Sequence, residues 1–97
     1  ILIRSLLDKI CQEYKLNIVG KSEKVFKPQG LTVNYLLSES HLTIHTWPEK
    51  GKCCIDLFTC GDFKWYIDGK YNLSRLLAKF FNISKSNIRV SSIEREV

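Results

Sequence analysis

The sequence predicts an α+β domain in which an antiparallel sheet carries helices on one face. Apolar residues recur with helical spacing near both ends of the chain, and several β-rich runs lie between them. The chain has 97 residues, of which 44% are hydrophobic, so one domain spanning residues 1–97 can form a single core. The other sheet face needs cover, and a second copy of the chain would create an αββα sandwich.

The N-terminal half is expected to contain one helix followed by strands. The helix covers residues 1–14, where apolar side chains fall on one helical face at Ile3, Leu6, Leu7, Ile10, Cys11 and Tyr14. Strands are expected at residues 17–26, 31–37, 41–47 and 52–59. Proline and glycine close the turn at residues 48–51.

The C-terminal half is expected to add a helix and a strand. Residues 61–72 have no regular pattern. Asn72 or Ser74 can cap an amphipathic helix that continues to Phe81. Residues 88–93 are then predicted to form the last strand.

The charge of the chain does not indicate a nucleic-acid partner. Fifteen Lys and Arg residues against ten Asp and Glu give a formal charge of +5, but the basic residues are spread out and form no arginine-rich arm. No apolar run has the length of a membrane span, and no signal peptide is visible. We therefore expect a cytoplasmic protein that binds neither nucleic acid nor a membrane.

The four cysteines are expected to be reduced. They form no C-x-x-C pair, and neighbours such as Cys53 and Cys54 would point to opposite faces of a strand. No metal site is predicted. Three of the cysteines are interpreted as small packing residues, whereas Cys60, before Gly61 at a strand end, is placed where chemistry could use it.

The segment around Ser40 admits three interpretations. His41 and His45 have the spacing of a zinc-binding helix, but β-branched neighbours favour a strand, in which the two rings would lie about 13 Å apart. A serine hydrolase would need a strand–turn–helix elbow around Ser40, which is absent from the pattern. The third interpretation is a polar hairpin with incidental histidines.

Longer motifs carry a more specific signal. Residues 39–49 read Glu-Ser-His-Leu-Thr-Ile-His-Thr-Trp-Pro-Glu, and residues 56–62 read Asp-Leu-Phe-Thr-Cys-Gly-Asp. Upstream, residues 26–32 read Phe-Lys-Pro-Gln-Gly-Leu-Thr. Together these segments resemble the bacterial and archaeal S-adenosylmethionine decarboxylases, pyruvoyl enzymes that make the aminopropyl donor for spermidine.

The resemblance implies a chain that cuts itself between Glu39 and Ser40. In this family the serine hydroxyl attacks the preceding carbonyl carbon, and an N-to-O acyl shift gives an ester. Loss of the Ser40 α-proton then eliminates the Glu39 carboxylate, and hydrolysis leaves a pyruvoyl group on residues 40–97. That self-generated cofactor forms a Schiff base with the substrate amine and serves as the electron sink for decarboxylation.

The resemblance also implies a role for each matching position. His45 corresponds to the residue that takes the α-proton during processing, and Cys60 to the general acid that returns a proton to the substrate. Thr32 stands where the family usually has a serine that assists the acyl shift, so the hydroxyl is retained. Phe26 corresponds to an aromatic that stacks on adenine, and Glu49 to a carboxylate that binds the ribose hydroxyls.

Strand geometry adds a prediction about assembly. A tight turn at Ser38 and Glu39 would pair Leu37 with Ser40 and hence Thr32 with His45, although His45 would lie about 16 Å from its own Ser40. A five-residue loop at residues 48–52 would set Ser40 opposite Cys60. We therefore predict a homodimer with composite sites. Ser40 and Cys60 would come from one protomer, and the other would supply Thr32, His45, Phe26 and Glu49.

A departure from the family pattern leaves two alternatives open. The family normally has a strand before the first helix, and this strand is expected to be missing here. Some relatives decarboxylate ornithine or arginine, but Phe26 and Glu49 suit adenosine and favour S-adenosylmethionine. A shortened homologue could also be an uncleaved, non-enzymatic assembly partner of a longer copy.

Overall fold

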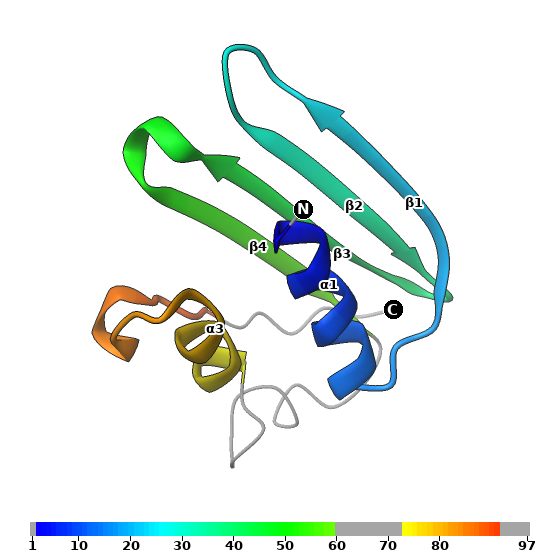
Figure 1. Ribbon diagram of the computed structural model, residues 1–97. Helices are drawn as coiled ribbons and strands as arrows, with labels where there is room; N and C mark the ends of the chain where they lie inside the picture. Colours follow the sequence, from blue (N-terminus) through cyan, green and yellow to red (C-terminus); the bar gives the residue numbers. More distant parts are fainter. Residues whose placement is uncertain (1, 60–72, 92–97) are drawn as a thin grey trace. The chain divides into compact units, whose positions relative to one another are not determined.

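A computed structural model describes residues 2–59 and 73–91 of the chain (Figure 1). These residues belong to two compact units, Ile1–Thr59 and Cys60–Val97. The first unit contains a helix and a four-stranded sheet, and the second contains a helix and a short 3-10 helix. None of the helices within the described ranges is long and apolar enough to cross a membrane.

The first helix, α1 (Leu2–Glu13), is amphipathic, as predicted. Its inward face buries Leu6, Leu7, Ile10 and Cys11, and Tyr14, directly after the helix, is buried as well. The helix ends where Lys15 adopts a positive φ of 55° and the Leu16 amide donates to the Cys11 carbonyl at 2.8 Å. A left-handed residue followed by a backbone hydrogen bond that spans five residues is a common way for a helix to end.

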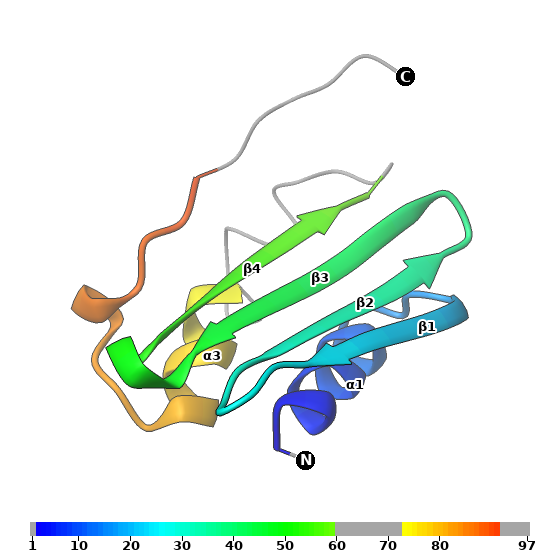
Figure 2. The ribbon, with the colours of Figure 1, turned by 90° about the horizontal axis from the view of Figure 1, so that it is seen from above.

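Four antiparallel strands form the sheet in chain order: β1 (Ile18–Val25), β2 (Leu31–Leu37), β3 (Ser40–Trp47) and β4 (Lys52–Phe58). Figure 2 shows α1 lying along one face of this sheet. The α+β class with an antiparallel sheet is therefore confirmed, and the strand predicted at residues 31–37 has the observed bounds.

Side-chain alternation divides the sheet into a covered and an open face. Val33, Tyr35 and Leu37 of β2 are buried on the α1 side, as are Leu42 and Ile44 of β3. Alternate residues project from the open face, and they are mostly polar or half-buried: Thr32, Asn34, His41, Thr43, His45, Asp56. Thr32 and His45, two of the predicted site residues, therefore lie on the open face.

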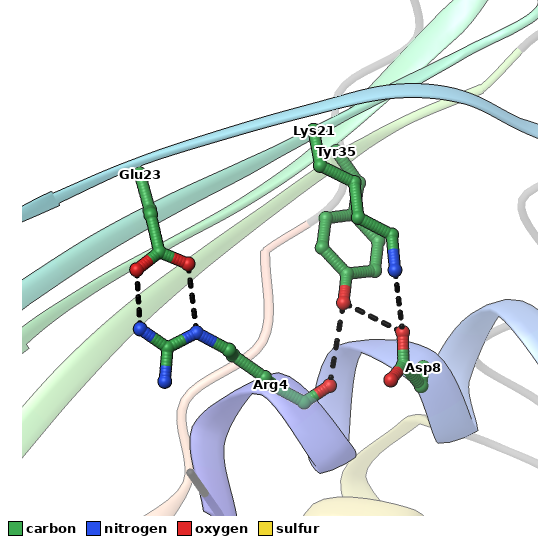
Figure 3. A network of polar contacts seen from close by, with 5 residues as sticks. All are labelled: Arg4, Asp8, Lys21, Glu23 and Tyr35. Atoms are coloured by element: carbon green, nitrogen blue, oxygen red, sulfur yellow. Dashed lines mark hydrogen bonds and ion pairs between the residues drawn. The ribbon is translucent and has the colours of Figure 1, made fainter.

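A polar network ties α1 to the edge of the sheet (Figure 3). The Tyr35 hydroxyl donates to Asp8 Oδ1 at 2.6 Å, and Lys21 Nζ lies 3.5 Å from the same oxygen. Burial and the contact with Asp8 raise the pKa of Tyr35 above its ordinary range. Arg4 forms a two-point contact with Glu23 that lowers the pKa of this carboxyl.

The turn between β3 and β4 covers the predicted residues 48–51, and β4 begins at the predicted residue 52. The five-residue loop at residues 48–52, from which the partner of Ser40 was predicted, is one residue too long. Residues 48–50 form a 3-10 turn, and Gly51 adopts a left-handed conformation with φ of 61°, so the chain reverses within four residues. Lys52 therefore belongs to β4 and pairs with Trp47. His41 pairs with Phe58, and continuing this register sets Ser40 opposite Thr59. The prediction that Ser40 lies opposite Cys60 was wrong by one residue.

The second unit contains α3 (Leu73–Phe81), close to the predicted helix. Asn82 follows with a positive φ of 54°, and the Ser84 hydroxyl then caps a 3-10 helix at Lys85–Asn87. Ile88 has an extended backbone, but residues 88–91 pair with no described strand. The prediction of a strand at residues 88–93 was therefore wrong for residues 88–91. An extended backbone forms a strand only when a neighbouring strand shares its backbone hydrogen bonds. Residues 61–72 lie outside the described ranges.

Candidate active site

Thr32 and His45 meet across β2 and β3 as a directly opposed pair. The Thr32 hydroxyl and His45 Nδ1 share a hydrogen bond of 2.9 Å. The tight turn at the other end of the hairpin pairs Leu37 with Ser40, which fixes the register of the whole hairpin. The predicted processing pair therefore lies together on the open face.

A shallow pocket of about 320 Å³ opens beside this pair. Four of its lining residues were predicted from the sequence as site residues: Phe26, Thr32, His45 and Glu49. Phe26 directly follows β1, Thr32 and His45 belong to β2 and β3, and Glu49 lies in the turn after β3. The hydroxyl, imidazole, phenyl ring and carboxylate thus line one cavity within a single chain.

The β1–β2 loop gives the pocket one wall. The Phe26 amide donates to the Gly30 carbonyl at 2.9 Å, which closes the loop onto itself. Gly30 has a φ of 113°, outside the range that other residues adopt readily. A Cβ at Gly30 would lie 3.6 Å from Phe26 Cβ. This distance is an ordinary van der Waals contact, so the backbone conformation, and not lack of space beside Phe26, is what calls for glycine at residue 30. The Phe26 side chain is 46% exposed.

The Glu39–Ser40 peptide lies at the opposite end of the β2–β3 hairpin. Glu39 is exposed in the turn, and Ser40 begins β3. The side-chain nitrogen Nδ2 of Asn17 donates to Ser38 Oγ at 2.8 Å, and this bond connects the turn to the start of β1. The predicted cleavage point is thus an accessible peptide in a turn that is held from one side.

Ser40 and His45 of one chain do not meet. Five residues of regular strand separate them, which corresponds to about 16 Å. By strand alternation Ser40 shares the parity of buried Leu42 and Ile44, whereas His45 belongs to the open face. The structure therefore does not bring the predicted nucleophile to the predicted proton acceptor within one chain.

The described cysteines differ in their surroundings. Cys11 is buried, and burial raises its pKa to about 11. Cys53 is half-buried, and burial likewise raises its pKa. These two agree with packing roles, but Cys54 is exposed on the open face, so its predicted packing role was wrong for the single chain. Cys60 lies outside the described residues.

The two histidines engage different partners on the strand. His41 Nε2 donates to Asp56 Oδ2 at 2.9 Å, while His45 contacts Thr32. The strand around them and these separate partners do not support the helical zinc-site interpretation. Both histidine rings also lie near aromatic rings, His41 at 5.6 Å from Phe58 and His45 at 6.1 Å from Trp47.

Four further pocket residues were not predicted as site residues. They line the cavity together with the predicted four: Gln29, Gly30, Thr46 and Trp47. Trp47 lies two residues after His45 on the same strand, and this spacing alone could have placed it on the open face.

Comparison with known proteins agrees with the motif resemblance. A model of the family described as S-adenosylmethionine decarboxylase matches residues 1–96. This chain belongs to the S-adenosylmethionine decarboxylase family. A protein of Archaeoglobus fulgidus named S-adenosylmethionine decarboxylase proenzyme is 45% identical over 60 residues, covering 62% of this chain and 54% of that protein. A Clostridium kluyveri protein of the same name is 48% identical over 85 residues, covering 77% of this chain and 68% of that protein.

A solved family structure supports the fold. The crystal structure of the adenosylmethionine decarboxylase from Aquifex aeolicus matches with a TM-score of 0.61 and 27% sequence identity. The match covers 98% of this chain and 78% of that chain. This chain spans about half the length of the archaeal relative. The α+β fold is thus shared with a solved decarboxylase.

Proposed function

We propose that the chain is a self-processing, pyruvoyl-dependent decarboxylase that acts on S-adenosylmethionine. The observation that carries this proposal is the pocket lined by Phe26, Thr32, His45 and Glu49, beside a hairpin whose turn holds the Glu39–Ser40 peptide. The names of the curated relatives, which are called proenzymes, support a role for chain cleavage.

Self-processing would begin at Ser40. Its hydroxyl oxygen attacks the Glu39 carbonyl carbon, the peptide bond to the Ser40 nitrogen breaks, and an ester forms. His45 then takes the Ser40 α-proton, and the Glu39 carboxylate leaves. Thr32 holds the imidazole through the bond to Nδ1, which leaves Nε2 for the proton transfer.

The residues at the cleavage point fit the cofactor that the family uses. A pyruvoyl group can form only from a serine at residue 40, and this serine follows an exposed turn residue, Glu39, in a turn fixed by the Leu37–Ser40 pair. When present, the group supplies an electron sink for the carbanion left by loss of carbon dioxide. Cys60 is proposed to return the proton to the substrate carbon.

The pocket suits the nucleoside end of the substrate. Phe26 offers a half-exposed ring on which an adenine can stack, and Glu49 offers a carboxylate that can accept hydrogen bonds from ribose hydroxyls. The volume of about 320 Å³ is at the lower end for small-molecule sites. One chain therefore supplies part of the enclosure that a substrate of this size needs.

A second copy of the chain would complete the site. Because Ser40 lies far along β3 from its own His45, the proton transfer requires His45 of another protomer. The open face carries no described helix of its own unit and bears exposed Leu36. We propose a two-fold dimer through this face, with two composite sites.

The test is the intact mass of the purified chain, followed by a substrate panel. Cleavage should give fragments of residues 1–39 and 40–97. The second should be lighter, by the mass of ammonia, than a fragment of residues 40–97 that begins with an unmodified serine. The cleaved protein should release carbon dioxide from S-adenosylmethionine. An uncut chain after prolonged incubation would contradict the enzymatic proposal, and release from ornithine or arginine alone would contradict the substrate.

A further inference from the structure

We propose that the His41–Asp56 pair is a tether that positions residue 40 after the chain has been cut. This inference rests on the proposed function, but it concerns two residues that lie outside the pocket. His41 Nε2 donates to Asp56 Oδ2 at 2.9 Å, which joins β3 to β4 one residue after the cleavage point. The His41 ring also lies 5.6 Å from that of Phe58, its direct partner on β4.

Before cleavage, residue 40 is held from two directions. The covalent turn joins it to Leu37 of β2, and the Asn17–Ser38 bond fastens that turn to the start of β1. The His41–Asp56 contact adds little to the position of Ser40 at this stage. Self-cleavage should therefore proceed without the pair.

Cleavage opens the covalent turn and also separates residue 40 from the Asn17–Ser38 bond. Ser38 and its bond to Asn17 remain with the fragment of residues 1–39, whereas residue 40 becomes the free end of the other fragment. Conversion of Ser40 also removes its backbone nitrogen, so the residue can no longer donate a backbone hydrogen bond to β2. Residue 41 becomes the first residue with a full set of backbone groups.

His41 is then the first residue of the new chain whose side chain is held by another strand. The next polar bond along β3 joins Thr43 to Asn34 of β2 at 2.6 Å, two residues farther from the reacting end. The pair lies on the open face, where its side chains are 33% and 61% exposed in the single chain, so the bond can form without disturbing the core between the sheet and α1. A tether at this point limits rotation of the end that must meet the substrate.

The test compares two rates in the same full-length chain. Asp56→Ala should leave the rate of self-cleavage within about two-fold of the unmodified chain and lower kcat for decarboxylation about five-fold, the range of an exposed charge-assisted bond. KM should stay unchanged, because neither residue lines the pocket. His41→Gln, which retains a donor near Nε2, should restore most of the kcat that His41→Ala loses.

Thr43→Val is the matched control, because it removes a polar bond between strands on the same face while leaving His41 and Asp56 in place. It should change neither rate. Equal losses of cleavage and kcat in Asp56→Ala would overturn the tether and leave the proposed function intact, as would an unchanged kcat. Failure of the unmodified chain to cleave or decarboxylate would overturn the proposed function as well.

Discussion

Thr32 Oγ1 and His45 Nδ1 lie 2.9 Å apart across two neighbouring strands. Their position follows from a turn five residues away, because pairing of Leu37 with Ser40 fixes every opposed pair in the hairpin. The same turn contains the Glu39–Ser40 peptide. The local geometry that exposes the proposed cleavage point therefore also sets the proposed proton acceptor beside its supporting hydroxyl.

Removal of the Thr32 hydroxyl should slow self-cleavage. Thr32→Val keeps the shape of the side chain but loses the bond to His45, and we expect cleavage to slow about ten-fold. Thr32→Ser keeps the hydroxyl and should cleave at a rate close to that of the unmodified chain. A time course of intact mass measures both, and equal rates for the valine and serine variants would contradict the role.

Composite sites predict complementation between two inactive variants. Ser40→Ala and His45→Ala should each remain uncut when expressed alone. When they are co-expressed with different tags, the His45→Ala chain should be cut, because its Ser40 meets His45 of the partner. Circular dichroism of the separate variants serves as the folding control. An uncut His45→Ala chain in a mixed dimer would contradict the composite arrangement.

The pocket side chains should affect substrate binding more than self-cleavage. Loss of an aromatic ring that stacks on a base weakens binding by about 1–3 kcal/mol, so Phe26→Ala should raise KM for S-adenosylmethionine about ten-fold. Glu49→Gln should raise KM in the same direction. Val25→Ala removes an exposed apolar side chain outside the pocket lining and should leave KM unchanged. A KM unchanged in Phe26→Ala would contradict the adenine site.

Tyr35 should make the stability of the chain sensitive to alkaline pH. Its pKa is raised above the ordinary value of 10.0 by burial and by Asp8, so the unfolded chain loses the phenolic proton at a lower pH than the folded chain. The contribution is complete below pH 10.0 and decreases as the pH rises toward the folded-state pKa. Urea unfolding across this range should show a steeper loss for the unmodified chain than for Tyr35→Phe. Equal slopes would contradict the prediction.

Two glycines with positive φ should respond differently to substitution. Gly30 has a φ of 113°, so Gly30→Ala should destabilise the fold by about 1–3 kcal/mol through backbone strain. Gly51 has a φ of 61°, within the left-handed region that asparagine tolerates, so Gly51→Asn should cost much less. Thermal unfolding compares the two variants. Equal losses of stability would contradict the conformational argument.

Much of the first unit could be predicted from local sequence pattern. Alternation of Val33, Tyr35 and Leu37 with more exposed neighbours defines β2, and a two-residue turn then sets the β2–β3 register. The β3–β4 register was missed by one residue, because the prediction that Ser40 faces Cys60 counted Lys52 in the loop, whereas Lys52 pairs with Trp47. The convergence of Phe26 and Glu49 on the Thr32–His45 pair depends on loop conformations that side-chain periodicity does not encode.

Two other predictions were wrong because they depend on the neighbours of a strand and not on its own sequence. Residues 88–91 have a sequence typical of a strand, but pairing depends on a neighbour elsewhere in the chain. Strand alternation distinguishes Cys53 from Cys54, yet residue type alone suggested packing for both. The proposed role of Cys60 stays a prediction.

Scission at the β2–β3 turn would change how the molecule can be assembled. The contacts that pair β2 with β3 are intramolecular in the uncut chain, where the turn keeps the strands at high effective concentration. Once the turn is cut, the same hydrogen-bonded strand pair joins two separate polypeptides, and its stability depends on the concentration of the fragments. The mature protein would then retain an architecture acquired by its precursor. Fragments separated by denaturant would reassemble as a bimolecular reaction, more slowly at low concentration, whereas the uncut Ser40→Ala chain would refold at a rate independent of concentration so long as its monomer folds first.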